Sequence, residues 1–205
     1  LDCRGNEIEN LDLSNNTALI SVIARNNKLV SVDVSNSASL EELSVQMNFI
    51  TSLSVANNPV LKILNCDTNE IPSLDVTTNL FLEEMSIGAN NIPNIDVSNN
   101  TELTILTVDN NDLTTLDVTN NTKLVRLGLG TNDISTLDVT NQPLLENLNI
   151  SKSSFTALDV SQNLNLEILS TQFNQLTNLD VTNNVQLKTL KVNNNNLTGI
   201  DISQN

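Results

Sequence analysis

Apolar residues return along the chain in a fixed rhythm. The triplet Leu-Asp-Val, or a close variant, first stands at residues 11–13 and recurs every 21 residues, ten times in all, with the last copy at 200–202 and no insertion between copies. A unit this short cannot bury its own apolar face, so neighbouring units must stack on one another. The pattern predicts a solenoid in which equivalent residues of successive coils form columns.

A second pattern lies between the triplets and predicts a strand. Leu43 and Val45 alternate with polar residues, and Leu106 and Val108 repeat the alternation in a later copy. Strict alternation turns one face of a strand toward the core. The Asn that follows the strand recurs in every copy but one, in which Ser153 replaces it. Its amide can bond backbone groups that the bend would otherwise leave without partners.

The other half of each copy is too short, and too rich in Val, Thr and Asn, for a helix. We expect its Leu-x-Val triplet to form a second short parallel strand on the opposite side of each coil. Both sides would then advance at the strand spacing of about 4.8 Å. The expected shape is a slender, weakly curved rod.

The combined pattern Leu-x-x-Leu-x-Val-x-x-Asn-x-Leu resembles the leucine-rich repeat over essentially all 205 residues. Its Leu-Asp-Val-Ser-Asn-Asn half resembles the variant in surface and secreted proteins of Bacteroidetes-type bacteria and, more distantly, internalin-like repeats. The fold class expected is a leucine-rich repeat solenoid: mainly β, with parallel strands stacked coil on coil and little or no helix. The resemblance also implies an extracellular or cell-surface location.

We expect residues 1–205 to form a single solenoid domain of about ten 21-residue coils. The chain begins within a strand at Leu1 and stops at Asn205 without a polar cap, although solenoids need their terminal coils covered. It is therefore expected to be a fragment of a longer protein, or to stack on other copies through its ends. The oligomeric state is left open by the sequence.

Composition narrows the range of functions. Nine Lys and Arg against 24 Asp and Glu give a net charge of −15, which repels nucleic acids and anionic membrane surfaces. No apolar run approaches the roughly 18 residues of a membrane helix, so we expect no membrane insertion. The chain has no His, no Gly-x-Ser-x-Gly and no phosphate-binding glycine loop, so we expect no enzyme. Cys3 and Cys66 lie three periods apart, about 14 Å in such a stack, too far for a disulfide.

The middle residue of the triplet forms a column of nine outward-facing acids, which we call the aspartate ladder. It comprises Asp12, Asp33, Asp75, Asp96, Asp117, Asp138, Asp159, Asp180 and Asp201. Neighbouring carboxylates about 4.8 Å apart repel by roughly 1 kcal/mol or less in water, so some interaction must offset the repulsion. The Ser or Thr two residues later, with nearby turn N–H groups, can donate hydrogen bonds, and we expect a structural ladder.

The alternative for the same column is weakly bound calcium, which favours several oxygen ligands. Its candidate ligands are Asp96, Asp117, Asp138 and Asp159, although no calcium-loop spacing accompanies them. No other metal or cofactor is expected.

A different column varies from copy to copy. Outward positions on and after the first strand change in nearly every coil, and diverse side chains on a rigid sheet indicate a recognition surface. The glycines there, with Ala89, are interpreted as a nearly bare middle where a partner backbone could approach. The candidate partner-binding residues are Ile23, Arg25, Gln46, Met47, Asp67, Gly88, Asp109, Gly130, Lys152, Gln172, Phe173 and Lys191.

The first functional hypothesis is thus an extracellular or cell-surface module that binds a protein, for interaction or adhesion, through this variable face. The second is a passive structural spacer rod, in which the variation is drift on a solvated sheet. The third is a cation-loaded form of either, with calcium on the aspartate ladder.

Overall fold

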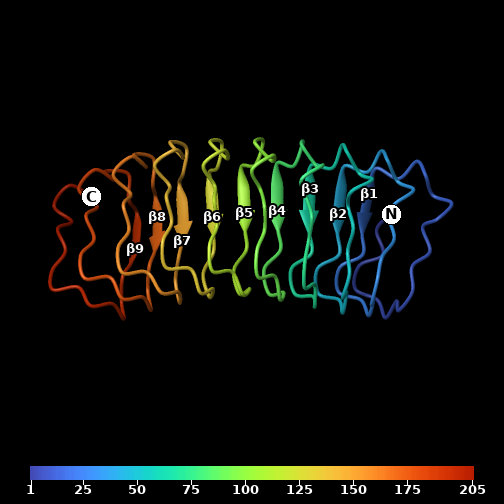
Figure 1. The fold of residues 1–205 in the computed structure, drawn as a ribbon, viewed down its shortest axis with the longest axis horizontal. Helices are drawn as coiled ribbons and strands as arrows, with labels where there is room; N and C mark the ends of the chain where they lie inside the picture. Colours follow the sequence, from blue (N-terminus) through green and yellow to red (C-terminus); the bar gives the residue numbers. More distant parts are fainter.

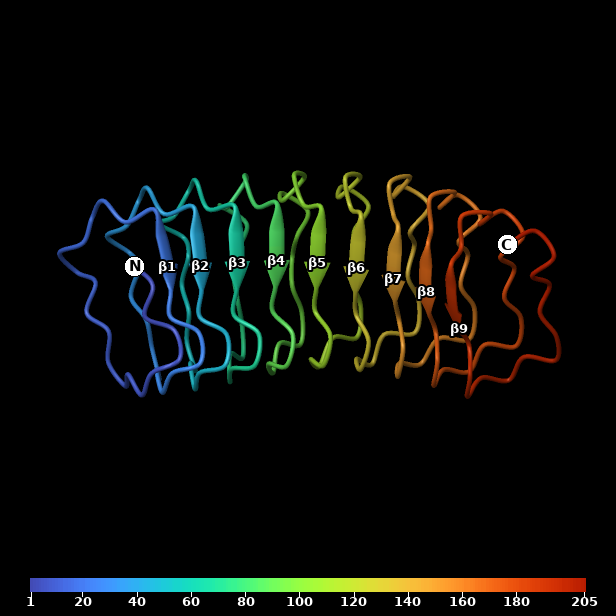
Figure 2. The same cartoon turned by 180° about the vertical axis from the view of Figure 1, so that it is seen from behind.

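The computed structural model describes residues 1–205 as one stack of coils, nine of which contribute one short parallel strand each (Figures 1 and 2). The nine strands form one sheet in chain order, and the chain has no helix. The strands are β1 (Ser21–Ile23), β2 (Glu42–Ser44), β3 (Ile63–Asn65), β4 (Glu84–Ser86), β5 (Ile105–Thr107), β6 (Arg126–Gly128), β7 (Asn147–Asn149), β8 (Ile168–Ser170) and β9 (Thr189–Lys191). The predicted fold class is confirmed.

Neighbouring strands pair in the register that the sequence period predicts. Val22 lies opposite Leu43, and Leu43 lies opposite Leu64, so each residue meets its equivalent 21 positions later. An isolated parallel bridge between Asp2 and Ile23 extends the pairing to the first coil. Coils of equal length therefore stack in step, and equivalent side chains form columns. No helix suited to crossing a membrane occurs anywhere in the stack.

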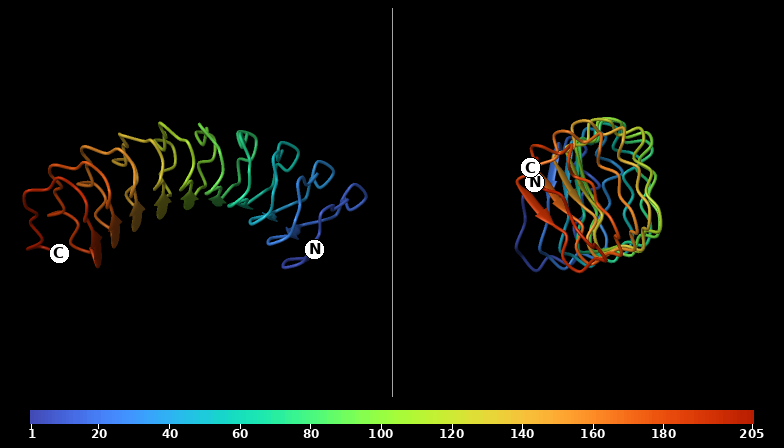
Figure 3. Two further views of the ribbon diagram at one scale, coloured as in Figure 1. Left: turned by 90° about the horizontal axis from the view of Figure 1, so that it is seen from below. Right: turned by 90° about the vertical axis from the view of Figure 1, so that its left-hand side faces the viewer.

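The stack bends into an arc with the strands on its inner side (Figure 3). The predicted second strand is wrong. Residues 53–55 and the equivalent triplets form no strand, and their backbones share no hydrogen bond with the triplets of the next coil. Instead, the chain closes a turn within each coil, as where Asn58 N donates to Val55 O at 3.0 Å. Because the strands are joined by a continuous backbone ladder and the triplets are not, the coils can lie farther apart on the triplet side, and the rod curves.

The core is one continuous column of 45 buried apolar residues running between the strands and the triplets. Leu43 and Val45 from β2 and its extension, and Val55 from the following triplet, are fully buried. Burying an aliphatic side chain of this size contributes about 1.5–3 kcal/mol. Cys66 is buried in the same column and Cys3 lies at its end, and both are unpaired, as predicted.

The predicted asparagine column after each strand is confirmed as a hydrogen-bonded ladder. Asn48 Nδ2 donates to Val45 O in its own coil at 2.9 Å and to Ala24 O in the preceding coil at 3.1 Å. Its Oδ1 accepts from the N–H of Leu29 at 3.0 Å. One buried amide therefore joins two coils and satisfies three backbone groups at the bend.

A second amide ladder, which the sequence analysis missed, stabilises the turn that follows each triplet. Asn79 Nδ2 donates to Val55 O and to Asn58 O of the preceding coil, both at 2.9 Å. Its sequence signal is the third residue after each triplet, which is Asn in eight of the ten copies and is buried at each Asn from Asn58 to Asn184. The members that donate to two carbonyls in this way are Asn58, Asn79, Asn100, Asn121, Asn163, Asn184 and Asn205. At equivalent positions, Gln142 donates only to Val118 O, and the Ser37 hydroxyl makes no such bond.

Candidate protein-binding face

Four outward positions of each coil form the inner surface of the arc, which we call the concave face. They are the first and third strand residues, the residue two beyond the strand, and the residue after that. In the coil of β2 these are Glu42, Ser44, Gln46 and Met47. The face runs from Asp2 in the first coil to residue 194 in the coil of β9.

All twelve predicted partner-binding residues lie on the concave face, but they are distributed along the whole arc and form no single cluster. Exposed members are Arg25, Met47, Lys152, Phe173 and Lys191. The partly buried members are Ile23, Gln46, Asp67, Asp109 and Gln172, and the buried ones are Gly88 and Gly130. Met47 and Phe173 expose 57% and 49% of their surface, so both can serve as apolar anchors.

The interpretation of the glycines as a bare middle is wrong. The N–H of Gly88 donates to Asp67 Oδ1, and the N–H of Gly130 donates to Asp109 Oδ1 at 2.8 Å. A Cβ placed on Gly128 would collide with Asp109 Oδ2. Carboxylates from the preceding coils therefore fill the space above the glycines and leave no notch for a partner backbone.

These two carboxylates differ electrostatically from the others in the chain. Burial raises the pKa of Asp67 and of Asp109, although the glycine N–H donors oppose the change. Asn149 Nδ2 also donates to Asp109 Oδ1, at 2.8 Å, across two coils. The middle of the face is thus a polar network that is largely satisfied within the protein.

Sequence reasoning missed one column of the face. The first residue of each strand points outward, and this column includes apolar Ile63, Ile105 and Ile168 as well as Arg126. All three isoleucines are partly exposed. The alternation along each strand could have revealed this column, because the first strand residue lies two positions before the third, which was predicted to point outward.

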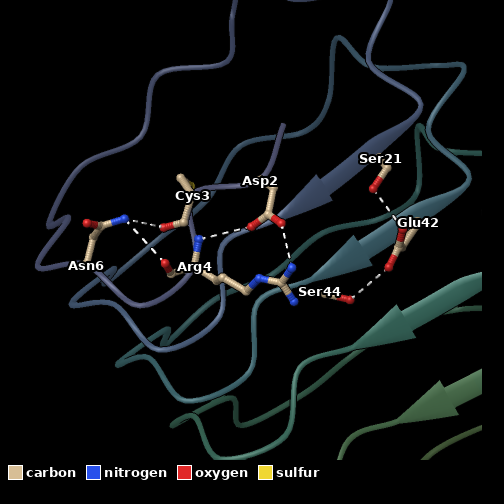
Figure 4. A network of polar contacts seen from close by, with 7 residues as sticks. All are labelled: Asp2, Cys3, Arg4, Asn6, Ser21, Glu42 and Ser44. Atoms are coloured by element: carbon tan, nitrogen blue, oxygen red, sulfur yellow. Dashed lines mark hydrogen bonds and ion pairs between the residues drawn. The ribbon is translucent and has the colours of Figure 1, made fainter.

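At the N-terminal end of the face, acidic groups are already paired (Figure 4). Arg4 forms an ion pair with Asp2 at 2.9 Å. Glu42 accepts hydrogen bonds from the hydroxyls of Ser21 at 2.7 Å and Ser44 at 3.4 Å. Arg25, which lines a hollow of about 680 Å³ with Arg4 and Met47, has no ion-pair partner.

The aspartate ladder lies on the opposite side of each coil, and the predicted hydrogen bonds are present. Asp75 Oδ1 accepts from the Thr77 hydroxyl at 2.6 Å and from the Thr77 backbone N–H at 2.9 Å. These two donors lower the pKa of Asp75. At each of the other ladder positions, the hydroxyl and backbone N–H of the Ser or Thr two residues later lower the pKa of the aspartate in the same way.

The candidate calcium ligands Asp96, Asp117, Asp138 and Asp159 each accept a backbone N–H from their own turn at 2.9 Å. No group of three or more acidic, Cys or His side chains is arranged to hold a metal ion. Calcium binding to the ladder stays a prediction.

No family model matches the sequence, and neither does any curated protein. Solved structures do match. The functional domain of InlJ from Listeria monocytogenes, which includes a cysteine ladder, is 28% identical and covers all of this chain with a TM-score of 0.57. A leucine-rich repeat protein of Leptospira interrogans is 21% identical over 90% of the chain with a TM-score of 0.83. This chain has the leucine-rich repeat fold.

This leucine-rich repeat chain is shorter than its structural neighbours. It spans 60% of the InlJ domain and 51% of the Leptospira protein. A third neighbour is the leucine-rich repeat ectodomain of the Arabidopsis thaliana membrane receptor kinase GASSHO1/SCHENGEN3, in complex with CASPARIAN STRIP INTEGRITY FACTOR 2. It is 21% identical over 93% of this chain and 26% of its own, with a TM-score of 0.81.

Proposed function

We propose that this chain is an extracellular or cell-surface module that binds a protein through its concave face. The observation that carries the proposal is a contrast between the two sides of each coil. The asparagine and aspartate ladders repeat one chemistry in nearly every coil, whereas the concave face changes chemistry from coil to coil on a rigid backbone. Repetition serves the scaffold, while diversity on a fixed sheet is suited to recognition.

The structural neighbours support this proposal by analogy. The plant receptor ectodomain was solved with a bound factor, and it has the same fold as this chain. The concave face also offers what protein interfaces use: exposed Met47 and Phe173 as apolar anchors, with Arg25 and Lys152 beside them. An adhesive role for the whole protein is part of the same proposal.

The proposal is tested by selecting binders from a displayed library of random peptides on the immobilised chain. The test variant carries Arg25→Ser, Met47→Ser, Lys152→Ser and Phe173→Ser, which removes exposed anchors without opening the core. Selected peptides are expected to bind this variant at least about ten-fold more weakly, since each lost anchor is worth about 1 kcal/mol or more.

A matched control changes two bases and two apolar residues outside the concave face: Lys28→Ser, Phe81→Ser, Lys123→Ser and Leu164→Ser. All four side chains are exposed. Peptides should bind this control as they bind the original chain, and circular dichroism should show that both variants fold. Equal binding to the two variants, or no selectable binder, would refute the assigned face and favour the spacer rod.

A further inference from the structure

The negative charge of this protein lies outside its concave face. Of the 24 acids and nine bases, five acids and five bases lie on that face, so the face is neutral. The other nineteen acids and four bases lie elsewhere and account for the whole charge of −15. The acids of the face are Asp2, Glu42, Asp67, Glu84 and Asp109, and its bases are Arg4, Arg25, Arg126, Lys152 and Lys191.

Ion pairing separates the bases further. Five of the nine form ion pairs with acids, and four of these five lie at turns or edges outside the concave face: Lys28, Lys62, Lys123 and Lys188. The four bases without an ion pair are Arg25, Arg126, Lys152 and Lys191, and all of them lie on the concave face. In a chain with such an excess of acids, unpaired bases confined to one face make that face suited to binding carboxylates.

The acids of the face occupy only one part of the arc. All five acids lie in the coils up to β5. From β6 onward, the face carries Arg126, Lys152 and Lys191 and no acid, and we call this stretch the basic half. It also presents Ile168 and Phe173, which are partly and largely exposed.

The acids near the basic half form no ion pairs with its bases. Lys152 shares a polar hollow with Asp112 and Asp133 of the adjoining turns, yet it forms no ion pair with either. Arg126 lies close enough to Asp109 for its charge to lower the pKa of that carboxyl, against the stronger effect of burial. The Asp109 carboxylate itself is bonded to Gly130 and Asn149.

We propose that the basic half receives an extended, carboxylate-bearing segment of the partner protein, an inference that rests on the proposed function. Arg126 and Lys191 lie three coils apart, about 14 Å along the axis, a span that about four extended residues cover. The segment should therefore carry two acids about four residues apart, with an apolar residue between them to contact Phe173 or Ile168. Charge complementarity of this kind selects partners and speeds their association.

An RNA ligand is disfavoured by the same distribution. Nineteen acids surround the concave face, and Phe173 is its only aromatic side chain, whereas single-stranded nucleic acids are bound by basic grooves with several stacking aromatics. Three unpaired bases suffice for a few carboxylates on a folded or extended protein segment.

The library selection described above also tests this inference. Peptides selected on the original chain should be enriched in Asp and Glu, and their affinity is measured by fluorescence anisotropy. Arg126→Gln with Lys191→Gln should weaken binding by about ten-fold or more, because charge-assisted hydrogen bonds are lost. Replacing the peptide's acids by their amides should cost a similar factor.

The matched control is Lys62→Gln with Lys123→Gln, which changes the net charge equally but at bases already paired outside the face. It should leave binding unchanged, and Arg126→Lys with Lys191→Arg, which keeps both charges, should largely retain it. Peptides without acidic enrichment, equal loss in the control, or tighter binding of a single-stranded RNA oligonucleotide would overturn the inference. If such peptides still depend on Met47 and Phe173, the proposed function survives while this inference fails.

Discussion

One residue in every coil adopts the left-handed backbone conformation. Gly5 does so in the first coil, and nine non-glycine residues follow with φ between 50° and 59°, including Thr68 and Thr131. For most L-residues this conformation costs about 1–2 kcal/mol, and Asn tolerates it best after glycine. The bend persists because the surrounding backbone is fixed: the N–H of Thr131 donates to Ser151 O of the next coil at 2.7 Å.

Replacing Thr131 by Asn should therefore stabilise the protein. The side chain is exposed and makes no hydrogen bond of its own, and Asn110 already adopts this conformation in the preceding coil. The expected gain is about 0.5–1 kcal/mol, from relief of the β-branched side chain in the left-handed region. It is measured as a higher urea midpoint. Thr115→Asn, at an exposed position without positive φ, should give no such gain, and an equal gain at both sites would contradict the explanation.

At the scale of the strands, aspartate and glycine on the concave face are complementary in shape. The Asp109 side chain lies where a side chain on Gly128 would otherwise be, and the N–H of Gly130 holds the same carboxylate in place. A small residue in one coil is thus required by a large polar residue in the coil before it. This coupling runs diagonally from the residue two beyond β5 to the end of β6, because Gly128 itself pairs with Thr107.

Gly128→Ala should destabilise the protein by about 1–3 kcal/mol, because the new methyl group forces the Asp109 carboxylate out of its site. In a chain that already carries Asp109→Ala, the same substitution should be neutral or stabilising by up to about 0.5 kcal/mol, since Ala restricts the unfolded chain more than Gly. A double-mutant cycle from denaturation midpoints measures the change of sign. The same cost in both backgrounds would show that the obstacle is not the carboxylate.

The strands, their register and the first asparagine ladder were predictable because each follows from a period of two or 21 in the sequence itself. The second strand was predicted wrongly because Leu-Asp-Val alternates apolar and polar residues as a strand does. In the structure, the Asp of the triplet accepts a hydrogen bond from the turn of its own coil, and the triplets form no sheet. The contact of Gly128 with Asp109 was not predictable either. This contact depends on the direction in which the Asp109 side chain turns toward the next coil, and the repeat pattern of the sequence does not indicate that direction.

Over the whole molecule, the sequence predicted a recognition face but not how charge is distributed across it. The net charge of −15 describes the whole chain and does not show that the concave face, with five acids and five bases, is neutral. The sequence placed Arg25, Lys152 and Lys191 on the face, but Arg126 could be added only after the strand's first residue was seen to point outward, at the start of β6. Coordinates were needed to identify bases that stay free beside acids, such as Lys152 near Asp112 and Asp133.

The same distribution of acids sets how stability depends on pH. In the folded protein, hydrogen bonds from the following Ser or Thr hold the pKa of all nine ladder carboxyls below the ordinary value for Asp, as at Asp75 and Asp117. A lowered folded pKa adds stability above the unfolded value, and this stability is lost as pH falls through the folded pKa. Asp67 and Asp109 have raised pKa values, so their protonation acts in the opposite direction and occurs first.

As pH falls, the urea midpoint should therefore hold or rise slightly while Asp67 and Asp109 take up protons, and then fall steeply below about pH 3.8 as the more numerous ladder acids are protonated. Converting Asp96, Asp117 and Asp138 to Asn should flatten the acid fall, because these positions no longer titrate. A control that converts Glu70 to Gln and Asp112 and Asp133 to Asn removes three exposed acids that accept no hydrogen bond from their own turns. This control should keep the steep fall; if it flattens the curve equally, general charge repulsion and not the aspartate ladder governs acid stability.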